Sequence, residues 1–340
     1  MSIHSIEELE NRLAEPSDEL IADLGKVDGD IMLLGVGGKM GPSMARLAVN
    51  AIQKGGLNKK VIGVSRFSSG DLKRQLEDMG VRTISADLLN EEELQALPDV
   101  KNVIFMAGNK FGTTGNEHFT WAMNAYLPGR VSEKFKHSRM VVFSTGNVYP
   151  LTPVGAGGAT EEAAPNANGE YGQSCLGRER VFEHFSRKYD IPMFIYRLNY
   201  AIDLRYGVLL ELAKSVKEGK AIDIAMGHAN VIWQGDANEI ALRALNVCSS
   251  PPVTMNVTGP ETLSLRWVAE EFGRRFGVKP AFVGEEAPTA LLSNASKAMQ
   301  TFGYPKVSVL QMIDWIAYWV LQDGATWNKP THFQQREGKF

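Results

Sequence analysis

Three glycines, Gly35, Gly38 and Gly41, follow one another at intervals of three residues directly after a short apolar run. Gly37 adds a fourth, and Pro42 suits the first turn of a helix beginning here. Glycines between a strand and a helix N-terminus let the backbone approach a pyrophosphate, whose charge the free N–H groups and the helix dipole stabilise. The stretch therefore predicts a phosphate cradle; an ordinary glycine-rich turn is the alternative interpretation.

The next expected strand, 61–64, ends at Ser65 and Arg66. In a nucleotide-binding βαβ unit this end lies beside the adenosine ribose, where an acid accepts the 2′-OH of NAD and a basic residue suits the 2′-phosphate of NADP. No acid occurs before Asp71, so the sequence favours NADP, with NAD possible. A solvent-facing arginine is the alternative interpretation of Arg66.

Asp87 and Leu88 follow a third expected strand. An Asp at the carboxyl end of a strand can contact the adenine rim of a dinucleotide, or it can cap the helix expected at 91–97. The fourth expected strand ends at Met106-Ala107-Gly108, and this tip is expected to pass beneath the cofactor.

These sites must be positioned by strands that alternate with helices. Buried strands are expected at 31–34, 61–64, 81–86, 103–108, 140–145 and 193–198. The alternation predicts an α/β fold with a doubly wound parallel sheet. We expect an N-terminal helical extension over 1–29, a dinucleotide-binding domain over 30–200, and a smaller substrate lobe over 201–340 that is interleaved with it. Open α/β sheets bind ligands outside the carboxyl ends of their strands, so the cleft between the halves is the predicted site.

Composition excludes several other classes of protein. The 340 residues are 44% hydrophobic and 22% charged, with a net charge of -3. This charge gives no reason to expect nucleic acid or an anionic membrane as a partner, and no apolar run approaches the ~20 residues that a membrane span needs. Two cysteines provide no disulfide framework, and six scattered histidines show no metal-ligand spacing. We expect a cytoplasmic protein without a structural metal.

From about residue 30 to 323, the chain resembles the extended short-chain dehydrogenase/reductases, the NAD-dependent epimerase/dehydratase group. The motifs that carry the resemblance are the glycine loop, Asp87-Leu88, Met106-Ala-Gly, Asn124, Ser144-Thr145-x-x-x-Tyr149, Tyr171 at a helix start, Arg197-x-Asn199-Tyr200, Asp236 and Asn256-Val-Thr-Gly259. The resemblance implies a Rossmann-like fold, a nicotinamide dinucleotide cofactor and a homodimer. The dimer would pair helices at 117–136 and 171–189, to which Phe182 and Phe185 could contribute unless they pack inward.

The resemblance also implies catalytic residues. In that family a Ser or Thr holds the reacting oxygen, a Tyr is the general acid/base, and a Lys four residues after the Tyr lowers the Tyr pKa and binds the nicotinamide ribose. Thr145 and Tyr171 match this pattern, as does Asn124, but Cys175 stands where the family has Lys. A phenol with an ordinary pKa near ~10 is a poor base at neutral pH, so the missing cation matters.

Three interpretations of Cys175 remain open. Another cation can substitute: Arg178 lies three residues further along the same helix face, and Lys110 lies on a loop facing the cleft. Cys175 can itself take part as an acid or weak base. Alternatively, redox activity is lost and the protein binds a dinucleotide as a sensor or scaffold. A small buried side chain at Cys175 is compatible with the first or the third.

The hypothesis we favour is an NAD(P)-dependent enzyme that acts on a sugar, nucleotide-sugar or sugar acid by hydride transfer. A non-catalytic dinucleotide-binding protein is the alternative. The residues expected to bind the cofactor are Gly35, Gly37, Gly38, Lys39, Met40, Gly41, Ser65, Arg66, Asp87, Leu88, Met106, Ala107, Gly108 and Asn199. Those expected to contact the substrate are Lys110, Asn147, Tyr149, Arg205, His228 and Trp233.

Overall fold

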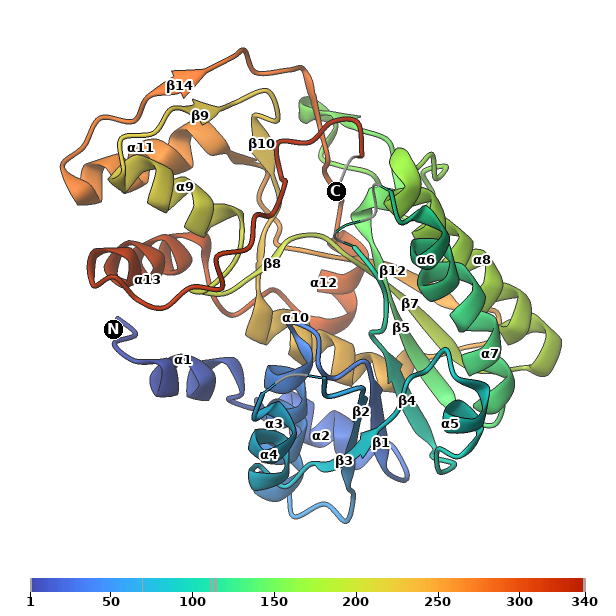
Figure 1. The fold of residues 1–340 in the computed structure, drawn as a ribbon. Coiled ribbons are helices and arrows are strands. Elements are labelled where there is room, and N and C mark those ends of the chain that lie inside the picture. Colours follow the sequence, from blue (N-terminus) through green and yellow to red (C-terminus); the bar gives the residue numbers. More distant parts are fainter. Residues whose placement is uncertain (1, 69, 111, 113–114, 339–340) are drawn as a thin grey trace.

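A computed structural model describes residues 2–338 of the protein, apart from 69, 111, 113 and 114 (Figure 1). Its centre is a seven-stranded sheet with the order β12-β7-β5-β4-β1-β2-β3. The strands are β1 (Ile31–Leu34), β2 (Val61–Ser65), β3 (Arg82–Ser85), β4 (Asn102–Phe105), β5 (Arg139–Thr145), β7 (Met193–Leu198) and β12 (Val253–Val257). Every neighbouring pair is parallel. The predicted doubly wound parallel sheet is confirmed, and its strand order reverses between β1 and β4, where such sheets bind ligands.

Helices cover both faces of this sheet because the side chains of each strand alternate between two cores. Ile31 and Leu33 of β1 face one core, whereas Met32 and Leu34 face the other. The helices of the first core are α2 (Asp18–Gly25), α3 (Gly41–Lys54), α4 (Leu72–Asp78), α10 (Gln234–Arg243) and α12 (Ser296–Phe302). Those of the second are α5 (Glu91–Gln95), α7 (Leu127–Lys134) and α8 (Gly169–Tyr189).

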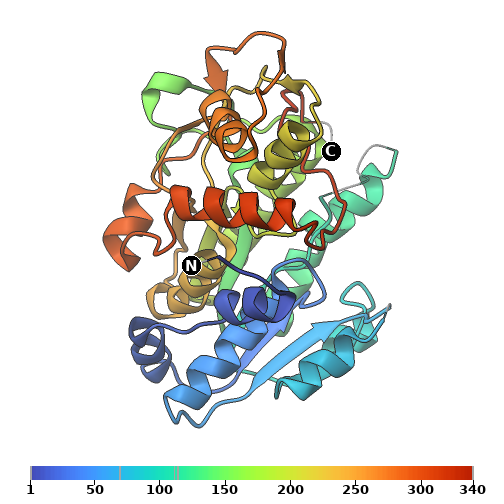
Figure 2. The same cartoon turned by 90° about the vertical axis from the view of Figure 1, so that its left-hand side faces the viewer.

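A separate core holds the second lobe together. Its helices are α1 (Ile6–Leu13), α9 (Val208–Lys217), α11 (Leu265–Phe276) and α13 (Val309–Leu321). Short strands pair with one another outside the main sheet: β6 (Thr152–Pro153), β8 (Ala201–Ile202), β9 (Ile222–Asp223), β10 (His228–Ala229), β11 (Ile232–Trp233), β13 (Leu263–Ser264), β14 (Phe282–Val283) and β15 (Thr289–Ala290). Figure 2 shows α13 lying across the molecule next to the N-terminal helices. The strand β12 comes from the C-terminal half of the chain but joins the main sheet beside β7, so the two parts are interleaved.

The N-terminal helices belong to different cores. Leu9 of α1 packs in the lobe, whereas Leu20 of α2 packs under the sheet. The Ser5 hydroxyl accepts the Glu8 N–H at 3.1 Å and the Ser17 hydroxyl accepts the Leu20 N–H at 3.0 Å, which caps each helix. The arm therefore joins the two parts of the protein.

The single helix expected at 117–136 is present as one continuous helical run over 117–134, in which α6 (Glu117–Trp121), a π-helical turn η1 (Ala122–Tyr126) and α7 follow one another. Pro128 lies in the first turn of α7 and has no N–H to continue the α-helical ladder. No helix in the described part of the chain is both long and apolar enough to span a membrane.

Candidate functional site

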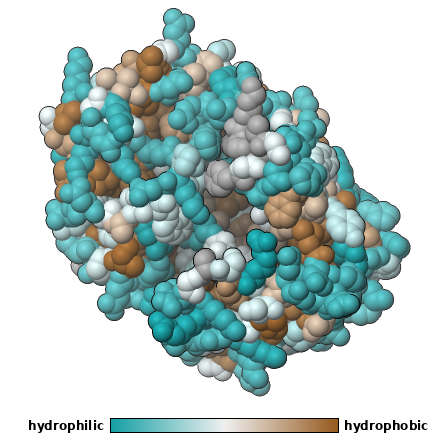
Figure 3. Space-filling view, viewed as in Figure 1, coloured by the Kyte–Doolittle hydropathy of each residue, from teal (hydrophilic) through white to brown (hydrophobic). Residues whose placement is uncertain are grey.

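One cavity of about 690 Å³ brings the glycine loop together with Thr145 and Tyr171. It lies at the carboxyl ends of β1, β4 and β5, and the surface is hollowed near the centre of the view in Figure 3. The predicted site residues that line it are Gly35, Gly37, Gly38, Lys39, Met40, Met106, Lys110, Thr145, Asn147, Tyr171 and Asn199. The tertiary structure thus joins residues more than 160 positions apart at one site.

Two of the loop glycines, Gly35 and Gly41, are required by close packing against backbone, and a third lies against a side chain. Gly35 has φ +89°, and a Cβ there would lie 2.8 Å from the Ala107 amide nitrogen. A Cβ on Gly37 would lie 2.5 Å from Ser65 Oγ, and one on Gly41 would overlap the Val36 carbonyl. Gly38 differs, because the nearest atom to its missing Cβ is the Gly35 carbonyl oxygen at 3.4 Å. The protein itself leaves this space open.

The N-terminus of α3 is suited to a phosphate. No side chain caps it, and the amides of Lys39 and Met40 have no backbone hydrogen-bond partner among the described residues. Free N–H groups at the start of a helix stabilise an anion through their hydrogen bonds and the helix dipole. This open cradle fits the pyrophosphate of a dinucleotide.

The residues expected near the adenosine lie beyond the cavity, at the ends of β2 and β3. Arg66 is exposed and makes no ion pair or hydrogen bond within the described part of the chain. Asp87 Oδ1 accepts the Leu89 N–H at 3.0 Å. The cap of α5 is Asn90, whose Oδ1 accepts the Glu93 N–H, so the capping interpretation of Asp87 is wrong.

Thr145 and Tyr171, the two residues that match the family's catalytic pattern, both line the cavity. Thr145 ends β5, and its Oγ1 accepts hydrogen bonds from the Asn147 N–H at 3.2 Å and from Asn147 Nδ2 at 3.0 Å. Tyr171 lies in the first turn of α8 and is hydrogen-bonded to Thr145. Burial, and then Cys175, raise the pKa of the Tyr171 phenol, while Arg178 and Thr145 act to lower it. Tyr171 thus needs additional positive charge to act as a base near neutral pH.

Cys175 supplies no such charge. Its side chain is fully buried in a small apolar cluster with Val148, Tyr149 and Ala159. Burial raises the pKa of the Cys175 thiol, with Arg178 opposing, so the thiol is neutral at pH 7. The structure therefore favours the small buried side chain over an acid or base role.

Asn124 supports the site from behind. It lies in η1, is fully buried, and does not line the cavity. Its Nδ2 donates to the Asn109 carbonyl at 2.9 Å and to Ser174 Oγ at 3.0 Å, and its Oδ1 accepts from Arg178 Nη2 at 2.5 Å. The π-helical turn places these groups where α6 and α8 meet the end of β4, and such turns are frequent at functional sites.

Four residues expected to contact the substrate do not line the cavity. The Tyr149 hydroxyl donates to Asn256 Oδ1 at 2.9 Å within the buried interior. Arg205 forms an ion pair with Asp203 at 2.8 Å. His228 lies in β10, and Trp233 is buried with its ring edge-on to another tryptophan. Asn147 and Lys110 are the two members of that set that line the cavity.

Sequence reasoning missed a group of cavity residues. Tyr200, Tyr206, Trp327, Lys329 and Thr331 all line it. The last three follow α13, beyond the part of the chain that carries a family resemblance, and no motif marks them. Only the path of the C-terminal segment across the mouth of the cavity brings them to the site.

Lys39 has a different partner from the one expected. Its Nζ donates to the Ala201 carbonyl at 2.7 Å and lies 4.5 Å from the centre of the Tyr206 ring. Burial lowers the pKa of Lys39 to about 8. The side chain thus connects the glycine loop to the second lobe, while its backbone amide faces the phosphate cradle.

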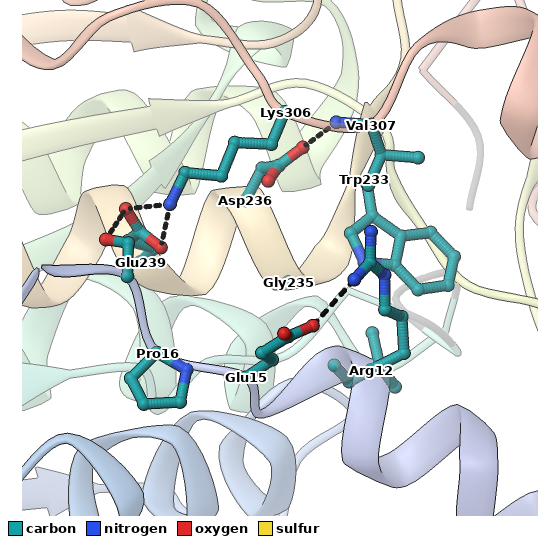
Figure 4. A pocket seen from close by; sticks show the side chains of 11 residues that line it. Arg12, Glu15, Pro16, Trp233, Gly235, Asp236, Glu239, Lys306 and Val307 are labelled. Atoms are coloured by element: carbon teal, nitrogen blue, oxygen red, sulfur yellow. Dashed lines mark hydrogen bonds and ion pairs between the residues drawn. The ribbon is translucent and has the colours of Figure 1, made fainter. Parts of the chain in front are cut away.

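A second cavity, of about 190 Å³, lies where the N-terminal arm meets α10 (Figure 4). Its charged side chains are paired with neighbours: Lys306 with Glu239 at 2.9 Å and Arg12 with Glu15 at 2.6 Å. Asp236 Oδ2 accepts the Val307 N–H at 3.0 Å. These contacts hold the arm, α10 and the segment before α13 together, and we assign the cavity to structure.

Asp236 gives this region a pH-dependent stability. Burial raises the pKa of Asp236 to about 6, from ~3.9 in an unfolded chain. The folded state therefore retains a proton more strongly, and its stability falls as the pH rises from about 4 to 6. At about 1.4 kcal/mol per pKa unit, the ionised carboxylate costs on the order of 3 kcal/mol above pH 6.

We expect Asp236→Asn to be more stable than the wild type at pH 8 and similar at pH 4.5 in urea unfolding. The exposed Asp78→Asn is the control, and an equal pH dependence in both variants would contradict this assignment.

Comparisons with known proteins agree with this architecture. The model of the "NAD dependent epimerase/dehydratase family" matches residues 31–230, more than half of the chain. No curated protein is similar enough to the chain to count as a match. The UDP-glucuronic acid 4-epimerase of Bacillus cereus, in complex with UDP-glucuronic acid and NAD, is 19% identical, with a TM-score of 0.69 over 86% of this chain and 99% of that one.

Two further solved structures show the same fold. The dTDP-glucose 4,6-dehydratase of Bacillus anthracis, in complex with NAD, is 16% identical, with a TM-score of 0.71 over 87% of this chain and 97% of that one. The UDP-glucose 4-epimerase of Thermus thermophilus, in complex with NAD, is 18% identical, with a TM-score of 0.68 over 85% and 98%. Together with the glycine loop and the cavity beside it, the family match shows that the chain belongs to the NAD-dependent epimerase/dehydratase family.

Proposed function

We propose that this protein is an NAD(P)-dependent enzyme that transfers a hydride at a carbinol carbon of a sugar-derived substrate. The observation that carries the proposal is the single cavity in which an open phosphate cradle, Thr145 and Tyr171 meet. The similar structures, which contain NAD and in one case UDP-glucuronic acid, support a nucleotide-sugar or sugar acid as the substrate.

The residues of the cavity have separate roles in this proposal. The backbone amides of Lys39 and Met40 hold the cofactor pyrophosphate. Thr145, which Asn147 orients, hydrogen-bonds the substrate oxygen, and Tyr171 takes the proton of the substrate hydroxyl. A bound nicotinamide supplies the hydride acceptor or donor. The same set of residues can serve dehydrogenation, reduction, epimerisation or dehydration, since each of these reactions begins with hydride transfer at a carbinol or carbonyl carbon.

A panel of substrates tests the proposal. The purified protein is incubated with NAD or NADP and with nucleotide-sugars, free sugars, polyols and sugar acids, and both cofactor absorbance and product composition are followed. We expect turnover of at least one member. Tight dinucleotide binding without any turnover would instead support the non-catalytic sensor or scaffold, the function that the loss of lysine at position 175 favours.

The cofactor preference is tested at Arg66. We propose that its guanidinium pairs with the 2′-phosphate of NADP, since it is exposed at the end of β2. We expect Arg66→Ala to lower the affinity for NADP by about tenfold, the effect of one charge-assisted contact of ~1.4 kcal/mol, and to leave NAD affinity nearly unchanged. Titration of both cofactors by fluorescence measures the ratio. An unchanged ratio would remove the NADP preference and leave NAD.

We also propose a homodimer through α6, η1, α7 and α8. Phe182 cannot contribute, because it is fully buried and packs edge-on against Phe105 at 5.2 Å. Trp121 and Tyr126 are exposed large side chains on this face, and Phe185 is partly exposed. We expect sedimentation velocity to show a dimer at micromolar concentration and Tyr126→Glu to weaken it. A wild-type monomer would contradict the proposed assembly.

A further inference from the structure

The loss of lysine at position 175 leaves Tyr171 without its family partner, and two cations lie close enough to replace it. Arg178 acts on the phenol from within the protein, and Lys110 lies at the wall of the cavity. Their surroundings differ, and this difference decides which of them can serve the reaction.

Arg178 is committed to holding the structure. Its Nη1 donates to the Phe143 carbonyl at 2.8 Å, and its Nε and Nη2 donate to the Asn124 carbonyl and Oδ1 at 3.3 Å and 2.5 Å. The side chain is buried and does not line the cavity, and a Cβ on Gly108 would overlap its guanidinium. Arg178 therefore ties α8 to η1 and to the end of β5, and its guanidinium makes no direct contact with a ligand in the cavity.

Lys110, in contrast to Arg178, lies where its side chain can contact a ligand. It follows β4 on a loop, lines the cavity, and places its ammonium 5.9 Å from the centre of the Tyr171 ring. Glu211 of α9 attracts it by charge, the neutral Cys175 thiol of α8 lies nearby, and Lys39 of the glycine loop lies near enough for repulsion. The ammonium thus lies among the phenol, the second lobe and the cofactor cradle.

We propose that Lys110 replaces the family's lysine: its ammonium, supplied from the β4–α6 loop instead of α8, stabilises the Tyr171 phenolate and faces the sugar moiety of the bound cofactor. The inference rests on the proposed function. It explains how Thr145 and Tyr171 can serve in a chain with Cys175, since the positive charge has moved in the sequence while remaining beside the phenol in space.

The pH dependence gives a signature that a purely structural role would not produce. Burial lowers the pKa of Lys110 to about 8, so the positive charge is lost as the pH rises through 8. The wild-type kcat/KM should decline on the alkaline side near pH 8. Lys110→Arg should keep activity to within about tenfold and abolish this decline, because a guanidinium stays charged. Lys39, whose pKa is also about 8, would produce a decline that Lys110→Arg leaves in place.

Relocation of the charge is the decisive experiment. We expect Lys110→Met to lower kcat/KM by about 10²-fold or more. The double variant Lys110→Met/Cys175→Lys should recover at least tenfold of that loss. The control Lys279→Met changes an exposed lysine and should have the kcat/KM of the wild type. Thermal unfolding of each variant establishes that it is folded. If the wild type is active and Lys110→Met has the same kcat/KM, the role assigned to Lys110 is overturned while the proposed function stands. If the wild type shows no turnover, both the proposed function and the role of Lys110 are overturned.

A readout without turnover completes the test. Acetic anhydride at low concentration, followed by peptide mass spectrometry, measures the pH at which Lys110 becomes nucleophilic, with the exposed Lys279 as the internal reference. We expect a midpoint near pH 8 for Lys110, against ~10.4 for an ordinary lysine, and protection of Lys110 by added dinucleotide. An ordinary midpoint without protection would place Lys110 away from the site and overturn the proposal.

Discussion

Tyr171→Phe should lower kcat by about 10²- to 10⁴-fold while the affinity for the dinucleotide stays within about threefold of the wild type. The substitution removes the one hydroxyl that can exchange a proton with the substrate, and it keeps the ring that packs at the start of α8. Because the loss concerns proton transfer, it should appear in kcat and not in cofactor binding. Steady-state kinetics on the substrate found in the panel, with fluorescence titration of the cofactor, measure the two quantities.

Tyr304→Phe is the matched control for this variant, since Tyr304 is 74% exposed and remote from the cavity residues. It should retain wild-type rates. A Tyr171→Phe variant with more than about a third of wild-type activity would exclude the phenol as the acid/base and return Cys175 or a bound water to consideration.

Gly38→Ala should lower dinucleotide affinity by about 10- to 100-fold and leave the melting temperature of the free protein nearly unchanged. The protein leaves an ordinary contact distance of 3.4 Å around the added Cβ, and Gly38 does not have a positive φ, so the free chain accepts alanine. The methyl group would instead occupy space over the amides of the cradle. Overpacking of one methyl group costs about 1–3 kcal/mol, and every 1.4 kcal/mol is tenfold in affinity.

Two further glycines make this test specific. Gly155 has no atom within 4 Å of its missing Cβ and lies outside the cavity, so Gly155→Ala should bind as wild type. Gly41→Ala should lose both binding and stability, because its Cβ overlaps the Val36 carbonyl. If Gly38→Ala binds the dinucleotide normally, the cofactor does not lie over this loop.

Much of the framework could be read from local sequence. The apolar runs at 31–34, 61–64 and 193–196 lie in strands because parallel strands buried on both faces need mostly apolar residues. The glycine spacing marked the loop for a similar reason, since the close approach of Gly35 and Gly41 to neighbouring backbone excludes any side chain. Such constraints act over a few residues and therefore appear in the sequence.

Long-range partners could not be predicted in this way. Tyr149 and Trp233 are polar-tipped aromatic residues that suit a binding site as well as a core, and the contacts of Tyr149 with Asn256, 107 residues away, decide between the two. The sequence predicted the helix over 117–136 but not the π-helical turn η1 that precedes Pro128 within it. The segment with Trp327 and Lys329 reaches the cavity only through the path of the chain after α13.

The sequence alone predicted the fold class, which the structure confirms, and it marked the glycine loop and Cys175 for attention, because each depends on residues next to one another along the chain. Only the tertiary structure distinguished the role of Arg178 from that of Lys110. Both are cations near Tyr171, but three hydrogen bonds to η1 and β5 fix Arg178 inside the protein, whereas the β4–α6 loop presents Lys110 to the cavity. How strongly a cation lowers the pKa of the Tyr171 phenol depends on the distance between them and on their exposure to water, and both are set by folding.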